Sequence, residues 1–228
     1  MTGTLSTELA ANGYPGRGIV VARTAEDGLC IVYFMTGRSP ASRDRALVRD
    51  GSSLYARARS AAEHDPLRHY RSVSVGTRWC VVGNGDQVDL ITSNLESMSP
   101  TDAVQGIEYE PDPPLRTPRI SVVAPRSGGP IVLAASRASA LSPATTYIAC
   151  LTMGELAVGC GVLTTTYRSR GTDVVDTSQP PTEVSIDATA AHELLAEVWN
   201  ALPAALRVAA AVVQPTLDDP LVIRSIVP

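Results

Sequence analysis

The feature that most constrains this chain is a repeated pattern: an apolar run, a turn containing glycine, and a second apolar run. In the first instance the apolar run 19–22 is followed by Glu26-Asp27-Gly28 and then by the run 29–35. Asp-Gly is typical of tight hairpins because these turns need residues that tolerate a positive φ. The pattern therefore predicts antiparallel hairpins.

Further strands follow the same logic along the chain. Residues 70–75 and 79–82 predict a second hairpin that turns at Gly76, and 120–124 with 131–135 predict another. The other expected strands are 87–92, 146–152 paired with 156–163 through Met153-Gly154, 208–213, and 221–223. Residues 53–59 show only weak local order, and 168–186, with two prolines and few apolar positions, are typical of a surface loop.

Two segments predict helices. In 100–109 the apolar residues are spaced for one face, and in 188–202 the pattern is stronger, with Asp187 or Thr189 as the expected cap. His192 falls on the apolar face of the second helix, so we expect it to be structural. Many strands in hairpin order with two or more helices predict an α+β fold. Residues 1–13 are expected to form a flexible arm ahead of a single domain at 14–228.

Composition narrows the function. The net charge of −4 argues against a general nucleic-acid binder, which would carry a basic face. All 19 basic residues are arginine, which excludes Schiff-base chemistry and a phosphate-loop lysine and suggests a bacterial genome rich in G and C. The four cysteines lack zinc-type spacing, so buried free thiols in a reducing cytosol are expected. No signal peptide or membrane span is apparent, which predicts a cytoplasmic protein.

The stretch from Met35 to Arg45 concentrates positive charge at a strand end. Three arginines and two serines occupy the eight positions 38–45, directly after an apolar run and Gly37. The arginine side chain offers a planar fork of donors that matches phosphate and carboxylate. Two interpretations stay open from this stretch alone: an anion pocket, most simply for a phosphate, or a solvated turn with surface arginines.

Other polar residues fall at strand ends and turns, where sites are usually built. Tyr70, Asn84 to Asp86, Glu110 and Arg119 are the candidates. Each also has a plain structural interpretation: Tyr70 as packing, Asn84 to Asp86 as a hairpin turn, Glu110 as a solvated carboxylate and Arg119 as an exposed strand start. The serine-hydrolase elbow, the zinc-protease helix and the phosphate loop are all missing from the sequence.

Taken together, these short motifs resemble the archaeal-type IMP cyclohydrolase family and its bacterial relatives. The resemblance is strong over residues 14–136 and weak in the C-terminal third. The motifs that carry it are Tyr14-Pro15-Gly16-Arg17-Gly18, Met35-Thr36-Gly37-Arg38-Ser39, Ser42-Arg43-Asp44-Arg45, Asp65-Pro66 with Tyr70, Gly83-Asn84-Gly85, Glu108-Tyr109-Glu110, Thr117-Pro118-Arg119-Ile120 and, weakly, Thr164-Thr165-Thr166-Tyr167.

The resemblance implies a fold and a reaction. The fold would be a four-layer αββα sandwich similar to N-terminal-nucleophile hydrolases, although Thr2 lies too far ahead of the first strand to serve as a nucleophile. The reaction would close 5-formamidoimidazole-4-carboxamide ribonucleotide to IMP with loss of water, without a metal or redox cofactor. A homo-oligomer, dimer or tetramer, is also what the family suggests.

The resemblance also implies roles for individual residues. The catalytic candidates are Arg43, Tyr70 and Glu110, and the substrate-binding candidates are Arg38, Ser39, Arg45, Asn84, Gly85 and Arg119. Departures from the family pattern at 99–114 and 168–186 leave two alternatives open. The same scaffold can act on a related purine-like nucleotide in specialised metabolism, by ring closure or amide hydrolysis. The protein can also be a nucleotide-binding protein without catalysis.

Overall fold

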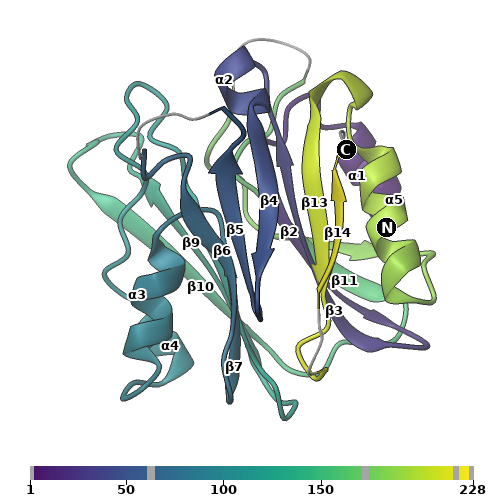
Figure 1. Ribbon diagram of the computed structural model, residues 1–228. Coiled ribbons are helices and arrows are strands. Elements are labelled where there is room, and N and C mark those ends of the chain that lie inside the picture. The colour runs from purple at the N-terminus through teal and green to yellow at the C-terminus, as the bar shows by residue number, and fades with distance from the viewer. Residues whose placement is uncertain (1–2, 61–64, 171–174, 218–220, 226–228) are drawn as a thin grey trace.

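The computed structural model describes residues 3–60, 65–170, 175–217 and 221–225, so Thr2 lies outside the described residues. Within them the chain forms two seven-stranded sheets, almost wholly antiparallel, and a few short helices (Figure 1). The predicted α+β class is therefore confirmed.

The first sheet contains the predicted hairpin at its centre. Its strands, in spatial order, are β1 (Gly3–Thr4), β12 (Thr182–Ser185), β11 (Cys160–Thr165), β2 (Arg17–Thr24), β3 (Gly28–Thr36), β13 (Arg207–Val213) and β14 (Leu221–Ser225). Thr24 pairs with Gly28, whose φ of 68° is the positive value that the Asp-Gly turn predicted. Among the described strands, only the short β1–β12 pair is parallel.

The second sheet runs through the middle of the chain in sequence order. Its strands are β10 (Thr146–Met153), β9 (Ile131–Ala138), β8 (Arg119–Pro125), β7 (Trp79–Gly83), β6 (Tyr70–Val75), β5 (Ser53–Ala58) and β4 (Arg45–Asp50). The predicted pairs 70–75 with 79–82 and 120–124 with 131–135 are both present.

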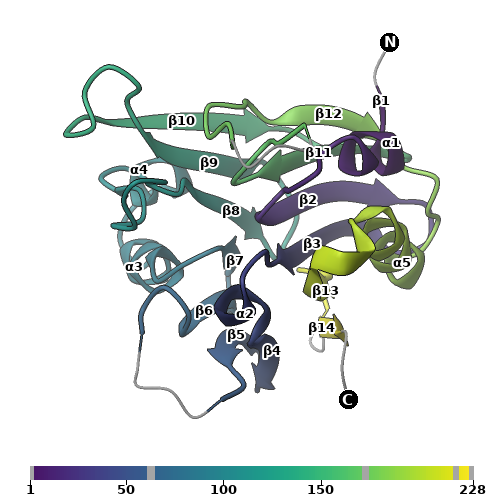
Figure 2. The same ribbon diagram turned by 90° about the horizontal axis from the view of Figure 1, so that it is seen from above.

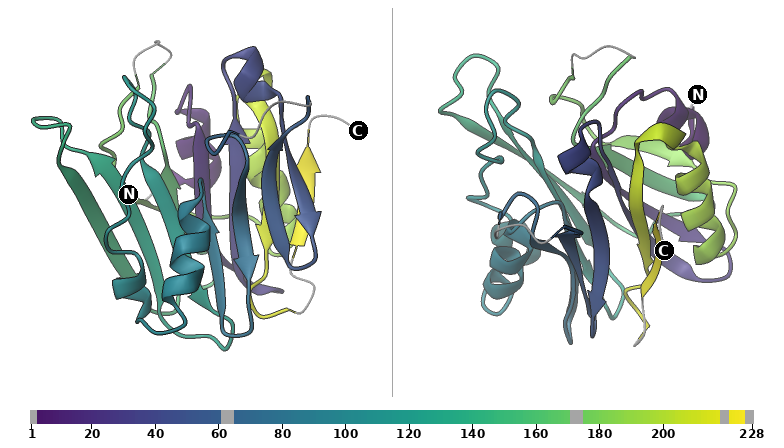
Figure 3. Two further views of the ribbon diagram at one scale, coloured as in Figure 1. Left: turned by 60° about the vertical axis from the view of Figure 1, so that its left-hand side comes forward. Right: turned by 45° about the horizontal axis from the view of Figure 1, so that its top comes forward.

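Burial follows the period of two that strands impose. Ile19 and Val21 of β2 enter a core shared with the second sheet, whereas Val20 and Ala22 face the opposite side. On that side lie α1 (Leu5–Ala10) and α5 (Ala191–Ala201). The outer face of the second sheet packs against α3 (Gln87–Asn94) and α4 (Pro100–Ala103). Helices thus cover the outer faces of two sheets that pack together (Figure 3).

Several local expectations were wrong. The expected strand 87–92 is α3, because Val88, Ile91 and Leu95 recur at helical spacing and pack against the second sheet. The expected helix 100–109 is helical only over α4. Residues 53–58 form β5, which pairs with the unexpected β4; in β5, buried Leu54 and Ala56 alternate with half-buried Ser53 and Tyr55 and exposed Arg57.

The expected hairpin of 146–152 with 156–163 was also wrong. The strand β10 pairs with β9 at the edge of the second sheet, while β11 pairs with β2 and β12 in the first, so the connection crosses between sheets (Figure 2). The expected loop 168–186 ends in β12. Of the four thiols, Cys30 and Cys80 are buried as expected, but Cys150 and Cys160 are exposed.

The N-terminal segment differs from the flexible arm that its composition suggested. Leu5 and Leu9 of α1 are fully buried in the layer that contains α5, and Thr4 caps the helix by accepting a hydrogen bond from the Thr7 amide. Two leucines four positions apart were enough to bury one face of a six-residue helix. In the described parts of the chain, no helix has the length and apolar character to cross a membrane.

Candidate functional site

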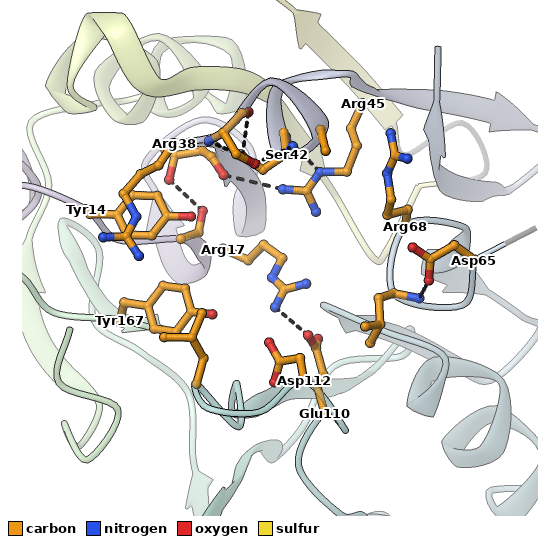
Figure 4. Close-up of a pocket in the computed structure, with 16 residues that line it drawn as sticks. Tyr14, Arg17, Arg38, Ser42, Arg45, Asp65, Arg68, Glu110, Asp112 and Tyr167 are labelled. Carbon is orange, nitrogen blue, oxygen red and sulfur yellow. Dashed lines mark hydrogen bonds and ion pairs between the residues drawn. The ribbon is translucent and has the colours of Figure 1, made fainter. Parts of the chain in front are cut away.

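A cavity of about 370 Å³ opens where the ends of β2 and β3 meet α2 (Pro40–Arg43) and the segment that leads into β8 (Figure 4). Four arginines, three acids and two tyrosines give the cavity its chemical character. The residues that line it are Tyr14, Gly16, Arg17, Thr36, Arg38, Ser39, Ala41, Ser42, Arg45, Asp65, Leu67, Arg68, Glu110, Asp112, Leu115 and Tyr167.

A buried ion pair lies at the centre of the cavity wall. Arg17 begins β2, and its Nη2 donates to Glu110 Oε2 at 2.8 Å. Only 7% of Arg17 and 3% of Glu110 is exposed to solvent. Figure 4 shows the Arg17 side chain extending across the cavity to reach the carboxylate. The pair therefore joins the first sheet to the segment that enters the second.

Burial and charge act in opposite directions on this pair. Burial raises the pKa of Glu110 above its ordinary value of 4.5, while the charge and hydrogen bond of Arg17 oppose that rise. Burial lowers the pKa of Arg17, but Glu110 and nearby tyrosine hydroxyls outweigh it, so the pKa is raised overall. Arg17 thus remains a cation, and the net effect on Glu110 is a raised pKa.

Arg45 is a second buried arginine of the cavity wall. Arg45 is 6% exposed, and its Nε donates to the Ser42 carbonyl at 2.9 Å and its Nη2 to the Thr36 carbonyl at 3.4 Å. No carboxylate in the described parts of the chain forms an ion pair with it. Arg68, on the same side of the cavity, pairs with Asp44 at 3.2 Å. A buried cation held only by carbonyl oxygens favours an anionic ligand beside it.

Two stacked tyrosines form the opposite wall. The rings of Tyr14 and Tyr167 lie 5.4 Å apart with an angle of 22° between their planes, and the Arg38 guanidinium lies 4.2 Å from the Tyr14 centroid. The Tyr167 hydroxyl forms a hydrogen bond with Thr117 Oγ1. Burial raises the pKa of Tyr167 to about 12, so this hydroxyl is protonated at neutral pH. The wall offers aromatic surface and a positive charge together.

Four of the predicted site residues line the cavity: Arg38, Ser39, Arg45 and Glu110. The predicted anion stretch contains α2, whose cap residue Ser39 accepts from the Ser42 amide while Ser42 Oγ accepts from the Ser39 amide. The same stretch thus supplies the cap of a short helix and one wall of the cavity.

The other predicted residues lie outside the cavity wall. Arg43 is exposed and donates to the carbonyls of Gly37 and Arg38, within its own turn. The Tyr70 hydroxyl is 2.8 Å from the Tyr33 hydroxyl, and both side chains are buried. Their catalytic roles stay predictions.

The remaining three candidates lie close to Glu110. Asn84 is fully buried and donates to Glu110 Oε1 at 3.2 Å. A Cβ atom on Gly85 would lie 3.6 Å from the same oxygen. Arg119 forms an ion pair with Asp86. Asn84 therefore contacts the carboxylate from the protein side rather than the cavity side.

Sequence reasoning assigned no role to Arg17, Tyr14 or Tyr167. All three stand in motifs that carry the family resemblance, but neither charge nor spacing singled them out. The sequence feature that could have pointed to this part of the cavity is Arg17, a charged residue between two glycines at the start of an apolar strand. Within the described residues, no three or more His, Cys, Asp or Glu side chains gather closely enough to hold a metal ion.

The fold and the cavity define an α+β protein with an arginine-lined cavity near the junction of two largely antiparallel sheets. A family model described as IMP cyclohydrolase-like protein matches residues 14–219. The chain therefore belongs to this family, and the match continues well past the residues 14–136 where the resemblance is strongest. No curated protein sequence matches the chain.

Proposed function

We propose that this protein closes the second ring of a purine nucleotide, converting 5-formamidoimidazole-4-carboxamide ribonucleotide to IMP. In this reaction the carboxamide nitrogen attacks the formyl carbon, and the resulting carbinolamine loses its hydroxyl and the nitrogen proton as water. The observation that carries the proposal is Glu110, a buried carboxylate held 2.8 Å from Arg17 on the wall of a cationic cavity. The family match supports the same reaction class.

Glu110 is the proposed base. An amide nitrogen is a poor nucleophile, so ring closure needs a group that takes its proton as the new bond forms. Burial raises the pKa of Glu110 and so makes its carboxylate a stronger base. Arg17 opposes the rise in the pKa of Glu110 and, in this proposal, also faces the developing charge on the formyl oxygen. Arg43 and Tyr70, which lie outside the cavity wall, are retained as catalytic candidates.

Arg45 is the proposed phosphate receptor, with Arg38 and Ser39 as further substrate-binding residues. Arg45 is buried, and among the described residues its hydrogen-bond partners are carbonyl oxygens. A phosphate bound at Arg45 would direct the imidazole toward Glu110. The carboxamide and formyl groups would then be held together, as ring closure requires. Asn84, Gly85 and Arg119 complete the proposed site from behind Glu110.

The arrangement of layers supports the proposed likeness to N-terminal-nucleophile hydrolases. Helices cover both outer faces of two antiparallel sheets, which is the αββα order that the family implies. In this proposal the scaffold is used without a terminal nucleophile, because the cavity is built from Arg17, Arg45 and Glu110.

The test is direct. Purified protein is incubated with the formamido nucleotide, and IMP is followed by absorbance. We expect turnover in the wild type and a loss of about 10²-fold or more in Glu110→Gln, since a general base contributes at least that much. The matched control is Glu108→Gln, an exposed glutamate two positions earlier, which should retain wild-type turnover.

Absence of IMP in the wild type would contradict the proposal. Thermal stabilisation by the nucleotide without turnover would then favour the altered-substrate or purely binding alternatives. Amide hydrolysis would appear as formate released without IMP.

We also propose that the chain forms a homo-oligomer through β10. This edge strand has eight residues and no charged side chain, and Tyr147 and Leu151 are 50% and 42% exposed. Uncharged edge strands pair readily with other chains, whereas the opposite edge, β4, carries Arg49 and Asp50. Light scattering should give a multiple of 24.0 kDa for the wild type and the monomer mass for Leu151→Arg. A monomeric wild type would contradict this.

A further inference from the structure

The buried amides of Asn84 and Gln87 form a chain behind Glu110, and neither is among the described residues that line the cavity. Asn84 follows β7, and its Nδ2 donates to Glu110 Oε1 at 3.2 Å and to the Pro118 carbonyl at 2.9 Å. None of its surface is exposed. Asn84 therefore holds the carboxylate rather than a ligand.

The orientation of the Asn84 amide is fixed by the backbone. Its Oδ1 accepts from the Ile120 amide at 2.8 Å and from Gln87 Nε2 at 3.0 Å. A backbone N–H can only donate and a carbonyl can only accept, so exchanging Oδ1 and Nδ2 would lose the bonds to Ile120 and Pro118 together. The donor face of Asn84 is thus committed to Glu110.

Gln87 is itself held in one orientation. It lies in the first turn of α3, is 1% exposed, and its Nε2 also donates to the Ile120 carbonyl at 3.2 Å. A third contact runs to Ser121 Oγ at 3.4 Å. Three acceptors around one nitrogen leave the Gln87 amide no alternative orientation with equal hydrogen bonding, so Gln87 secures the acceptor side of Asn84.

We propose that Asn84 and Gln87 are positioning residues that keep the Glu110 carboxylate oriented and ionised for proton transfer. The proposal rests on the function proposed above. Arg17 binds one carboxylate oxygen and Asn84 binds the other, so both oxygens are fixed while each retains lone-pair capacity toward the cavity.

The charges around Glu110 determine how far its pKa moves when the hydrogen bond from Asn84 is lost. Arg17 on β2 and Arg119 on β8 favour the ionised form, while Asp112, from the same segment, disfavours it. Arg119 is itself paired with Asp86. The hydroxyls of three tyrosines lie near Arg17, namely Tyr33, Tyr70 and Tyr167. Against this set, Asn84 is a direct neutral donor to the carboxylate, so its loss should raise the pKa of Glu110.

The first variant is Asn84→Asp, which replaces a donor with a second carboxylate beside Glu110. We expect the acid limb of the pH profile of kcat/KM to move up by about one pH unit or more, with turnover largely restored at higher pH. The matched control is Asn94→Asp at the end of α3, where the side chain donates to the Ala103 carbonyl, away from Glu110. Its acid limb should not move.

The second variant is Gln87→Met, which adds no charge and keeps the length of the side chain. Without the hydrogen bond from Gln87, the Asn84 amide should be less well oriented toward Glu110. We therefore expect a smaller shift of the acid limb in the same direction. Gln105→Met, on an exposed position, is the control. Circular dichroism and thermal melts confirm that each variant is folded.

A carbon-13 NMR titration of the Glu110 carboxyl, assigned by its absence in Glu110→Gln, reports the same shift without turnover. If the wild type makes no IMP, the proposed function fails while this titration still tests the positioning role. An unchanged Glu110 titration in folded Asn84→Asp and Gln87→Met would overturn the inference. So would a loss of turnover that is equal at every pH.

Discussion

Arg17 and Glu110 form a bond that crosses from the first strand of the central hairpin to the segment before β8. Arg17→Met should lower the free energy of unfolding by about 3–5 kcal/mol, because it leaves a buried carboxylate without its cation. Urea unfolding measures the change. The double variant Arg17→Met with Glu110→Gln should be more stable than Arg17→Met alone, since the unpaired charge is gone.

The same pair gives a pH dependence with a defined sign. Burial raises the pKa of Glu110 above 4.5, so the folded state binds more protons than the unfolded state just above that pH. The Glu110 contribution to stability is therefore greatest at low pH and declines as pH rises. The effect should be larger in Arg17→Met, which lacks the opposing cation. A stability gap between Arg17→Met and wild type that stays constant from pH 4.5 to 8 would contradict this.

Gly16 is constrained in two ways that can be separated. Its φ is +70°, and a Cβ atom would lie 2.3 Å from Thr166 Oγ1 and 2.5 Å from Tyr167. Gly28 has a similar φ of +68° with open space around it. Gly28→Ala should cost about 1–2 kcal/mol for the backbone alone. Gly16→Ala should cost clearly more and weaken nucleotide binding by displacing Tyr167; equal unfolding free energies would contradict this.

At this scale the sequence pointed to Glu110 and Arg45, which line the cavity, but not to the direction of every side chain. Arg43 stood in the same charged stretch as Arg45, yet its donors are satisfied by carbonyls of its own turn. Asn84 stood in what could be a simple turn, and only the fold brings it against Glu110 across 26 positions. The direction in which a side chain points depends on contacts with segments far away in the sequence, and local sequence patterns do not reveal those contacts.

Among the elements, the β2–β3 hairpin and α5 depend on each other. The turn residue Asp27 accepts from the Ala191 amide at 2.7 Å and so caps α5, whose own cap residue Ala190 has no side-chain hydrogen bond. Asp27→Ala should therefore lower stability by about 1 kcal/mol. Asp27→Asn keeps an acceptor and should recover much of it; an equal loss in both variants would show that the charge alone matters.

The pattern of hairpins was readable because Gly and Asp mark turns locally, and α5 was readable from its apolar face. The cap of α5 and the pairing partners of the strands could not be read from the sequence. In place of the expected caps Asp187 and Thr189, the helix is capped by Asp27, 164 positions away. The failure at β10 and β11 has the same origin. Each strand is recognisable alone, but nothing local says that they belong to different sheets.

For the whole molecule, thiol reactivity reports the packing of both sheets. Burial raises the pKa of Cys30 to about 11 and that of Cys80 to about 12, and neither is exposed. With a thiol reagent at pH 8, Cys160 should react in the native protein, whereas Cys30 and Cys80 should react only as it unfolds. Mass spectrometry of labelled peptides assigns each site. Rapid native labelling of Cys80 would contradict the packing of β7.

The central ion pair also has a consequence for laboratory evolution. A buried pair replaced on both sides by well-packed apolar residues is often as stable as the original, or more so. A library selected only for heat resistance is therefore free to discard Arg17 and Glu110 together, whereas the proposed function predicts that one selected for IMP formation keeps both. Comparing the survivors of the two selections would show which residues stabilise the fold and which are needed for the reaction.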